Sequence, residues 1–243
     1  MTEPTAAILV IGNEILSGKV VDTNSPFLAA ELRKLGVALR RILTVPDEPE
    51  TIAMAIQDLR GSYDHVFTSG GVGPTHDDVT MEGIALGLGR RVIRHPDLEA
   101  GIRGYLGEKV NDAHLKMAEV PEGATLIQDP SLNFPTIQVE NIYVLPGIPE
   151  ILRKKFESLK ERFSDAPYYV RVIYTCCNES AIASSLHRAL EEFPALMLGS
   201  YPKLDDPEYR VKLTLESKDG DYVQRAFDRL VALLPMGAVV RTE

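Results

Sequence analysis

Several features typical of secreted, membrane and nucleic-acid-binding proteins are scarce or missing in this sequence of 243 residues. Its two cysteines, Cys176 and Cys177, are adjacent and so cannot link distant segments through disulfide bonds. No apolar run reaches the length of about 18 residues that a membrane span requires. The first residues lack the basic segment and apolar core of a signal peptide. We therefore expect a cytoplasmic protein with no membrane partner.

Positively charged residues are fewer than negatively charged ones. The sequence has 26 Lys and Arg residues and 35 Asp and Glu residues, which gives a formal net charge of −9. This balance argues against the nucleic-acid backbone as the main partner. It does not exclude a small anionic ligand, because the groups nearest the ligand determine its binding. With 44% hydrophobic and 25% charged residues the chain has the composition of a globular protein, and its length suits one large or two smaller domains.

The first two thirds of the chain alternate short apolar runs with helical patterns. Buried strands are predicted at residues 6–11, 37–45, 64–69 and 141–145. Helices are predicted at residues 24–35, 50–60, 78–88, 96–117 and 150–163. Short links between these elements predict an α/β fold, with a doubly wound, mostly parallel sheet between two layers of helices. We assign residues 1–164 to this three-layer domain.

A different order of elements follows a boundary at residues 164–167. Strands are predicted at residues 168–176, 195–201, 209–217 and 238–241, and helices at 178–193 and 220–234. This βαββαβ order is the split pattern of a ferredoxin-like α+β sandwich. We assign residues 165–243 to this second, smaller domain. We interpret Cys176 and Cys177, at the end of its first strand, as buried small side chains.

Polar segments follow three strands of the first domain. Gly12, Asn13 and Glu14 follow the first strand, residues 69–80 follow the third, and residues 146–150 follow the fourth. Because open parallel sheets bind ligands outside the carboxyl ends of their strands, we expect the three segments to share one cleft.

The glycine-rich segment Gly70-Gly71-Val72-Gly73 lies between a predicted strand and a predicted helix. Glycine lets backbone N–H groups approach a ligand closely, and the start of a helix favours an anion such as phosphate. The segment matches neither the Walker loop nor the G-x-G-x-x-G dinucleotide pattern. A phosphate-binding loop and a plain tight turn are both compatible with it.

Two adjacent carboxylates, Asp77 and Asp78, follow the glycine-rich segment. They would repel an anionic ligand unless a cation lay between them, and hard divalent cations commonly bridge carboxylate to phosphate. The pair therefore predicts a metal-dependent reaction on a phosphate ester or anhydride. Glu14 and Asp47 are further oxygen donors at neighbouring strand ends. Helix capping and solvent contact are the alternative roles for these four residues.

Three other polar residues near the predicted strand ends carry weaker signals. Asn24 and Ser69 could orient a ligand or serve local turns and caps. His76 lies in the loop after the glycines, and we interpret it as a surface residue rather than an acid or base.

Together these motifs are similar to the molybdopterin-binding-like domain family. The resemblance rests on residues 12–16, 22–24, 45–47 and 69–80. The form Gly-Gly-x-Gly-Pro-Thr-x-Asp-Asp-x-Thr at 70–80 resembles the branch that holds the CinA N-terminal domain and the N-terminal part of FAD synthases. Residues 115–123 and 144–149 resemble the same branch, and residues 131–136 and the second domain look more like FAD synthase than CinA.

The resemblance implies a metal-dependent hydrolase of nucleotide pyrophosphates, with ADP-ribose as the CinA-type substrate and FAD as the FAD synthase-type one. It implies a divalent cation of the Mg, Mn or Co class, with potassium as an additional candidate. The residues expected to act in catalysis and to hold the metal are Asp77, Asp78 and Glu14. The residues expected to bind substrate or phosphate are Gly12, Asn13, Asn24, Asp47, Ser69, Gly70, Gly71, Gly73, Pro74, Thr75, Thr80, Pro146 and Gly147.

The alternative function is a protein that binds molybdopterin or a nucleotide in molybdenum cofactor biosynthesis without hydrolysing it. In both cases the partner is a small-molecule ligand, and the family resemblance implies a homo-oligomer, either a dimer or a trimer.

Overall fold

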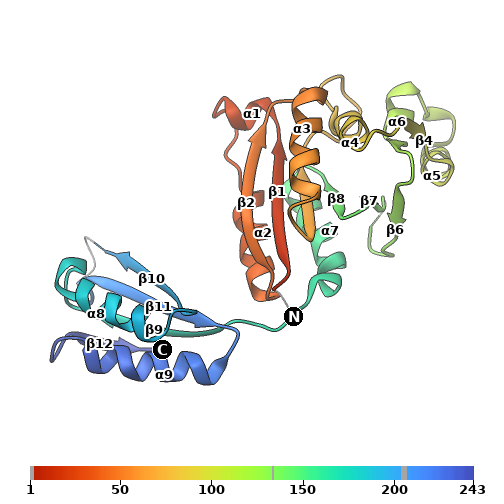
Figure 1. Ribbon diagram of the computed structural model, residues 1–243. Helices are drawn as coiled ribbons and strands as arrows, with labels where there is room; N and C mark the ends of the chain where they lie inside the picture. The colour runs from red at the N-terminus through yellow and green to blue at the C-terminus, as the bar shows by residue number, and fades with distance from the viewer. Residues whose placement is uncertain (1–2, 133, 204–206) are drawn as a thin grey trace. The chain divides into compact units, whose positions relative to one another are not determined.

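The computed structural model describes residues 3–132, 134–203 and 207–243, and Asn133 of the 131–136 segment lies outside these ranges. The chain divides into two compact units, residues 1–165 and residues 166–243 (Figure 1). No helix in the described ranges is long and apolar enough to cross a membrane.

The first unit is built on a six-stranded sheet in the order β2-β1-β3-β8-β7-β6. The parallel strands are β1 (Thr5–Ile11), β2 (Ala38–Val45), β3 (His65–Ser69) and β8 (Ile142–Leu145). The strands β7 (Thr136–Val139) and β6 (Thr125–Ile127) add an antiparallel edge. This confirms the mostly parallel sheet predicted from the apolar runs. The two edge strands escaped prediction because each is too short to show an alternating pattern.

Helices cover both faces of this sheet, as the three-layer prediction requires. They are α1 (Asn13–Leu16), α2 (Asn24–Lys34), α3 (Pro49–Arg60), α4 (Thr80–Leu88), α7 (Pro149–Leu159) and the 3₁₀ helix η2 (Lys160–Phe163). Alternate residues of β1 face opposite layers, so Ile8 packs in a core with α2 and α7 whereas Leu9 packs in a core with α3 and α4. Burial on both faces explains why β1 reads as a continuous apolar run.

A small excursion between β3 and β8 corrects one prediction. The single helix expected at residues 96–117 is wrong, because the chain forms α5 (Pro96–Leu106), η1 (Gly107–Lys109) and α6 (Asp112–Lys116) there. Gly107 ends α5 with a φ of 56°, and the Asn111 side chain accepts a hydrogen bond from the His114 N–H to begin α6. The flanking strands β4 (Val92–Arg94) and β5 (Glu119–Pro121) pair with each other.

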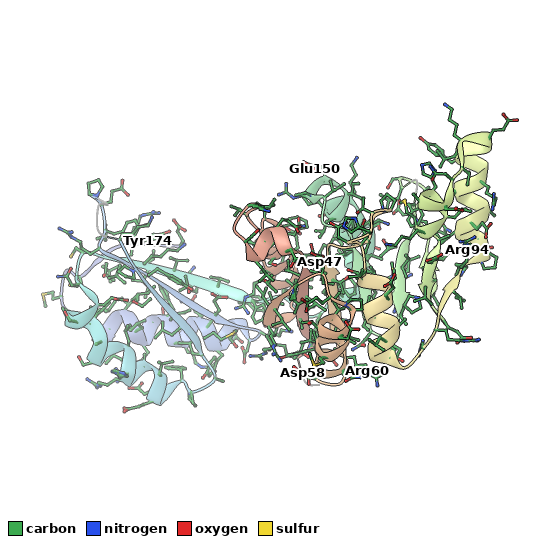
Figure 2. All side chains as sticks on the ribbon, turned by 90° about the horizontal axis from the view of Figure 1, so that it is seen from above. Asp47, Asp58, Arg60, Arg94, Glu150 and Tyr174 are labelled. Atoms are coloured by element: carbon green, nitrogen blue, oxygen red, sulfur yellow. The ribbon has the colours of Figure 1, made fainter. Side chains whose placement is uncertain are left out.

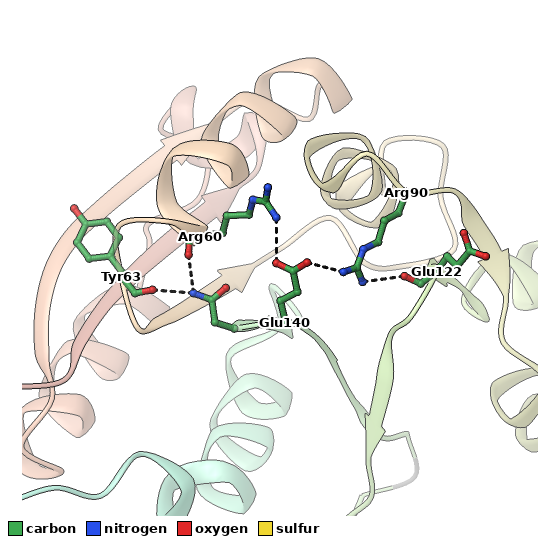
Figure 3. A network of polar contacts seen from close by, with 6 residues as sticks. Arg60, Tyr63, Arg90, Glu122 and Glu140 are labelled. Carbon is green, nitrogen blue, oxygen red and sulfur yellow. Dashed lines mark hydrogen bonds and ion pairs between the residues drawn. The ribbon is translucent and has the colours of Figure 1, made fainter.

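A polar network joins the amino ends of β3 and β8 to the excursion (Figure 3). Glu140 forms ion pairs with Arg60 and Arg90, at 3.2 and 2.5 Å. The amide nitrogen of Asn141 donates hydrogen bonds to the carbonyl oxygens of Arg60 and Tyr63, at 3.0 and 2.8 Å. These contacts fix the end of the sheet opposite the polar segments singled out above.

The second unit is an antiparallel four-stranded sheet in the order β10-β11-β9-β12. Its strands are β9 (Tyr169–Thr175), β10 (Met197–Pro202), β11 (Val211–Ser217) and β12 (Val239–Thr242), with helices α8 (Glu179–Glu192) and α9 (Gly220–Leu233). This confirms the ferredoxin-like α+β prediction. The burial expected for the cysteines is wrong for Cys176, which is exposed, because both cysteines lie beyond the end of β9.

Candidate functional site

A cleft of about 570 Å³ opens where β1, β3 and β8 end in the first unit. Polar segments from all three strand ends contribute to its walls, as the topology predicts. The expected site residues that line it are Glu14, Asn24, Ser69, Gly70, Gly71, Gly73, Pro74, Asp78, Pro146 and Gly147. The expected site residues outside the lining are Gly12, Asn13, Asp47, Thr75, Asp77 and Thr80.

The glycine-rich segment is held in a conformation that side chains would disrupt. Gly70 and Gly71 adopt φ values of 110° and 61°, in the region that favours glycine. A Cβ on Gly70 would collide with the carbonyl oxygen of Ile11. Thr80 closes the loop, because its hydroxyl donates to the Gly70 carbonyl at 2.9 Å and its N–H donates to the Gly71 carbonyl at 3.1 Å. Thr80 therefore positions the loop from outside the cleft.

The two adjacent aspartates face different surroundings. Asp78 lines the cleft and accepts hydrogen bonds from the Thr75 N–H, at 2.8 Å, and from the Thr75 hydroxyl. The side chain of Asp77 is 61% exposed and lies outside the cleft lining. Neither aspartate caps α4, which begins at Thr80 without a side-chain cap. The pair is thus one inward carboxylate and one solvated carboxylate.

The carboxylate of Glu14 enters the cleft from the short helix α1. It lies close above Gly12, where a Cβ would be 2.6 Å from its Oε1 atom. Asp47, labelled in Figure 2, accepts a hydrogen bond from the Asn13 N–H at 2.7 Å. Asp47 therefore holds the start of α1 in place, whereas Glu14 lines the cleft.

Asn24 ties three segments together at the base of the cleft. Its side-chain nitrogen donates to the Ser69 hydroxyl at 2.9 Å and to the Gly147 carbonyl at 2.8 Å, and the residue is only 6% exposed. Asp22 holds the beginning of α2, since its carboxylate accepts from the N–H groups of Asn24 and Ser25. The Asn24 amide thus joins α2 to the carboxyl ends of β3 and β8.

The carboxylates of the cleft suit a cation that binds together with a phosphate ligand, rather than a metal ion held by protein side chains alone. Across the described ranges, no three His, Cys, Asp or Glu side chains gather closely enough to hold a metal ion by themselves. Mg²⁺ usually takes only one or two protein carboxylates and completes its coordination with substrate phosphate and water. Glu14 and Asp78 both line the cleft and are carboxylates that could hold such a cation.

Two lysines in the cleft lining were missed by the sequence reasoning. The ammonium of Lys116, at the end of α6, donates to the Thr75 carbonyl at 2.6 Å. The ammonium of Lys155, on α7, donates to the carbonyls of Phe134 and Pro135 at 2.8 and 2.7 Å. Burial lowers the pKa of Lys155 to about 8. A signal existed for both lysines, because Lys155 falls on the apolar stripe of its helix and Lys116 lies in the segment 115–123 that resembles the CinA and FAD synthase branch.

Comparison with known proteins identifies the family. Residues 7–165 match the model described as "Probable molybdopterin binding domain". The chain belongs to this molybdopterin-binding domain family. Residues 167–243 match a second model, described as "FAD synthase, middle domain". These two matches confirm the resemblance drawn from the loop motifs.

Relatives of this chain match it across both units. The chain is 33% identical over 227 residues to a protein of Archaeoglobus fulgidus, covering 93% of this chain and 96% of that one. It is 31% identical over 258 residues to a "Probable FAD synthase" of Caenorhabditis elegans, covering 95% of this chain and 50% of that one. The chain thus spans about half the length of that FAD synthase relative.

A solved structure shares the fold of the first unit. The protein CinA from Thermoplasma acidophilum is 31% identical and aligns with a TM-score of 0.61, over 66% of this chain and 98% of that chain. This likeness confirms the fold of the first unit and its kinship with CinA.

Proposed function

We propose that this molybdopterin-binding-family protein is a metal-dependent hydrolase of nucleotide pyrophosphates, of the FAD or ADP-ribose class. The observation that carries the proposal is the meeting, in one cleft, of the Gly70–Gly73 loop with the carboxylates of Glu14 and Asp78. A glycine loop beside a helix start suits phosphate oxygens. Two carboxylates in the same cleft suit the cation that such a ligand needs.

The charges of the cleft support a cation as part of the reaction. The acidic residues that line it are Glu14, Asp22, Asp78, Glu82 and Glu119, and the basic ones are Lys116 and Lys155. An anionic pyrophosphate would be repelled by this excess of carboxylates unless a divalent cation of the Mg, Mn or Co class neutralised them. Potassium remains an additional candidate for a second cation.

Each part of the cleft then has a role in positioning the substrate. The loop at Gly70, Gly71 and Gly73 would bind the phosphate oxygens, and Lys116 would add a positive charge beside the loop. Glu14 and Asp78 would hold the cation, which polarises a phosphoryl group and activates water when bound. Thr75 orients the Asp78 carboxylate through two hydrogen bonds. Asp77, whose carboxylate lies in solvent, would reach the cation through a water molecule.

The substrate class rests on the relatives rather than on the cleft. The match of residues 167–243 to the FAD synthase middle domain, and the relatives named as probable FAD synthases, favour FAD within the proposed class. ADP-ribose remains the second member of the class because it contains the same ADP half.

The decisive experiment compares Asp78→Asn with Asp77→Asn. Turnover of FAD, ADP-ribose and NADH is measured with and without Mg²⁺, Mn²⁺ or Co²⁺. We expect Asp78→Asn to reduce metal-dependent turnover by about 100-fold or more, because it removes a carboxylate of the cleft. Asp77→Asn, a neighbour of the same size, should cost less. Full turnover in Asp78→Asn, or no turnover of any of these compounds by the wild type, contradicts the proposal.

A second candidate is binding of molybdopterin or a nucleotide without hydrolysis. The name of the matched family model favours it. Tight pterin binding together with no turnover would select this candidate. We further propose a homo-oligomer, a dimer or a trimer, which light scattering on the purified chain would test.

A further inference from the structure

One wall of the cleft is largely apolar and contains a buried cation. Phe134 and Pro135 form it together with Ile148, which precedes α7, and with Ile151 and Lys155 of that helix. The residue Lys155 is only 7% exposed, and its ammonium lies 5.7 Å from the centre of the Phe134 ring. A charge in such a wall is costly unless hydrogen bonds and a ligand compensate it.

Among the described residues, the hydrogen bonds of the Lys155 ammonium leave one donor unused. An ammonium has three N–H groups, and two of them go to the Phe134 and Pro135 carbonyls. No ion pair or further hydrogen bond joins the Lys155 ammonium to another described residue, and its backbone carbonyl accepts from the Ser158 hydroxyl. Because burial lowers its pKa only to about 8, the side chain is still mainly protonated at neutral pH. Lys155 therefore offers a desolvated positive charge at the edge of the cleft, with one N–H that has no partner in the described part of the chain.

We propose that Lys155 is a specificity-determining residue that donates a hydrogen bond to a carbonyl on a flat heteroaromatic ring packed against Phe134 and Pro135. This inference rests on the proposed function and deepens it, because it selects which half of a dinucleotide this wall recognises. A flavin ring bears such carbonyls, whereas adenine and the terminal ribose of ADP-ribose lack them.

The composition of the wall argues for a ring over a sugar. A ribose carries several hydroxyl groups, each of which needs a polar partner when it is buried. Phe134, Pro135, Ile148 and Ile151 offer no side-chain partners, so a sugar would leave hydroxyl groups unpaired. A large ring buries its faces against apolar side chains and needs only a few polar contacts at its edge. One cationic donor beside an apolar surface matches that need.

A purely structural role for Lys155 is the competing explanation. The side chain ties α7 to the segment before β7, and a tether of this kind would hold the wall for every ligand equally. The two roles therefore differ in selectivity: a tether affects all substrates, whereas a ring contact affects only ligands with a ring carbonyl.

The test compares FAD with ADP-ribose, which share their ADP half. For Lys155→Met we expect KM for FAD to rise about 10-fold with kcat little changed, since a lost hydrogen bond to a charged group costs about that much affinity. KM for ADP-ribose should stay within about 2-fold. Lys154→Met, an exposed neighbour on α7, is the matched control and should change neither value. Equal changes for both substrates, or no change for FAD, overturn the inference.

Direct binding separates this inference from the proposed function. Riboflavin affinity is measured by fluorescence without any divalent cation, for the wild type, Lys155→Met and Lys154→Met. If flavin binds and only Lys155→Met weakens it about 10-fold, the inference stands even if no pyrophosphate is hydrolysed. If FAD is hydrolysed while Lys155→Met binds flavin normally, the inference fails and the proposed function survives.

A ligand-side comparison needs no variant and so covers the case in which Lys155→Met misfolds. The wild type should bind riboflavin more tightly than a phenazine of similar size that lacks ring carbonyls. Equal affinity for the two, or no binding of riboflavin, overturns the inference.

Discussion

The amide of Asn24 gives the sharpest test of how the cleft is held together. Asn24→Ala removes hydrogen bonds to the Ser69 hydroxyl and the Gly147 carbonyl. Each bond contributes about 1 kcal/mol, and the part-buried Gly147 carbonyl would be left without this donor, which adds about 1 kcal/mol or more. The Ser69 hydroxyl can rotate to another partner. We therefore expect the free energy of unfolding to fall by about 2–3 kcal/mol.

Calorimetry of the purified chain measures this loss. For a unit of this size the expected change corresponds to a drop of roughly 4–12 °C in the melting temperature. Because Asn24 also joins the ends of β3 and β8 at the cleft, the same variant should weaken binding of ADP or FAD.

Asn141→Ala is the matched control. Its amide also donates two hydrogen bonds, to the carbonyls of Arg60 and Tyr63, but at the amino end of the sheet (Figure 3). Asn141→Ala should therefore lose similar stability and leave nucleotide binding unchanged. A loss below about 0.5 kcal/mol for Asn24→Ala would refute the stability argument. Equal loss of nucleotide binding in both variants would refute its link to the cleft.

Three further predictions concern packing, the loop and pH. Gly83→Ala places a Cβ 2.5 Å from the Ile52 side chain between α3 and α4, so urea denaturation should show a loss of about 1–3 kcal/mol. In Gly71→Ala the new Cβ would collide with the Thr80 hydroxyl, and residue 71 has a φ of 61° that alanine adopts poorly. Calorimetric titration should therefore show weaker binding of inorganic pyrophosphate. An unchanged affinity would contradict the role of the loop. The pKa of Lys155 is about 8 in the folded protein and 10.5 for an ordinary lysine. Between pH 8 and pH 10.5 the unfolded chain therefore binds more protons than the folded one, so the free energy of unfolding rises with pH. Relative to Lys155→Met, the wild type should gain at most about 3 kcal/mol from pH 8 to pH 10.5 in urea denaturation, and a flat difference would contradict the buried charge.

Much of the architecture could be predicted because it depends on the pattern of residues that are close together in the sequence. The apolar run of β1 and the alternating strands of the second unit reveal burial directly from sequence. The prediction of secondary structure failed where a glycine with positive φ interrupts a helix and where strands are very short. Gly107 divides one expected helix, and the strands from β4 to β7 have only three or four residues each, too few for a periodic signal.

Part of the candidate site could likewise be predicted from the sequence, and part depends on the tertiary structure. The order of strands and loops by itself determined that the segments after β1, β3 and β8 meet, because the carboxyl ends of parallel strands share one edge. Only the tertiary structure decided which carboxylate faces the cleft. Asp78 turns inward with Thr75 while Asp77 faces solvent, although the two are adjacent in sequence.

The sequence alone thus determined the fold class and the place of the cleft, through local patterns of burial and glycine. The tertiary structure decided the chemistry of its walls. Lys116 reaches the Thr75 carbonyl and Lys155 reaches the Phe134 carbonyl across 41 and 21 residues of chain. The physical reason is that a side chain's direction and charge state depend on the segments packed against it, and distance along the chain does not reveal those contacts.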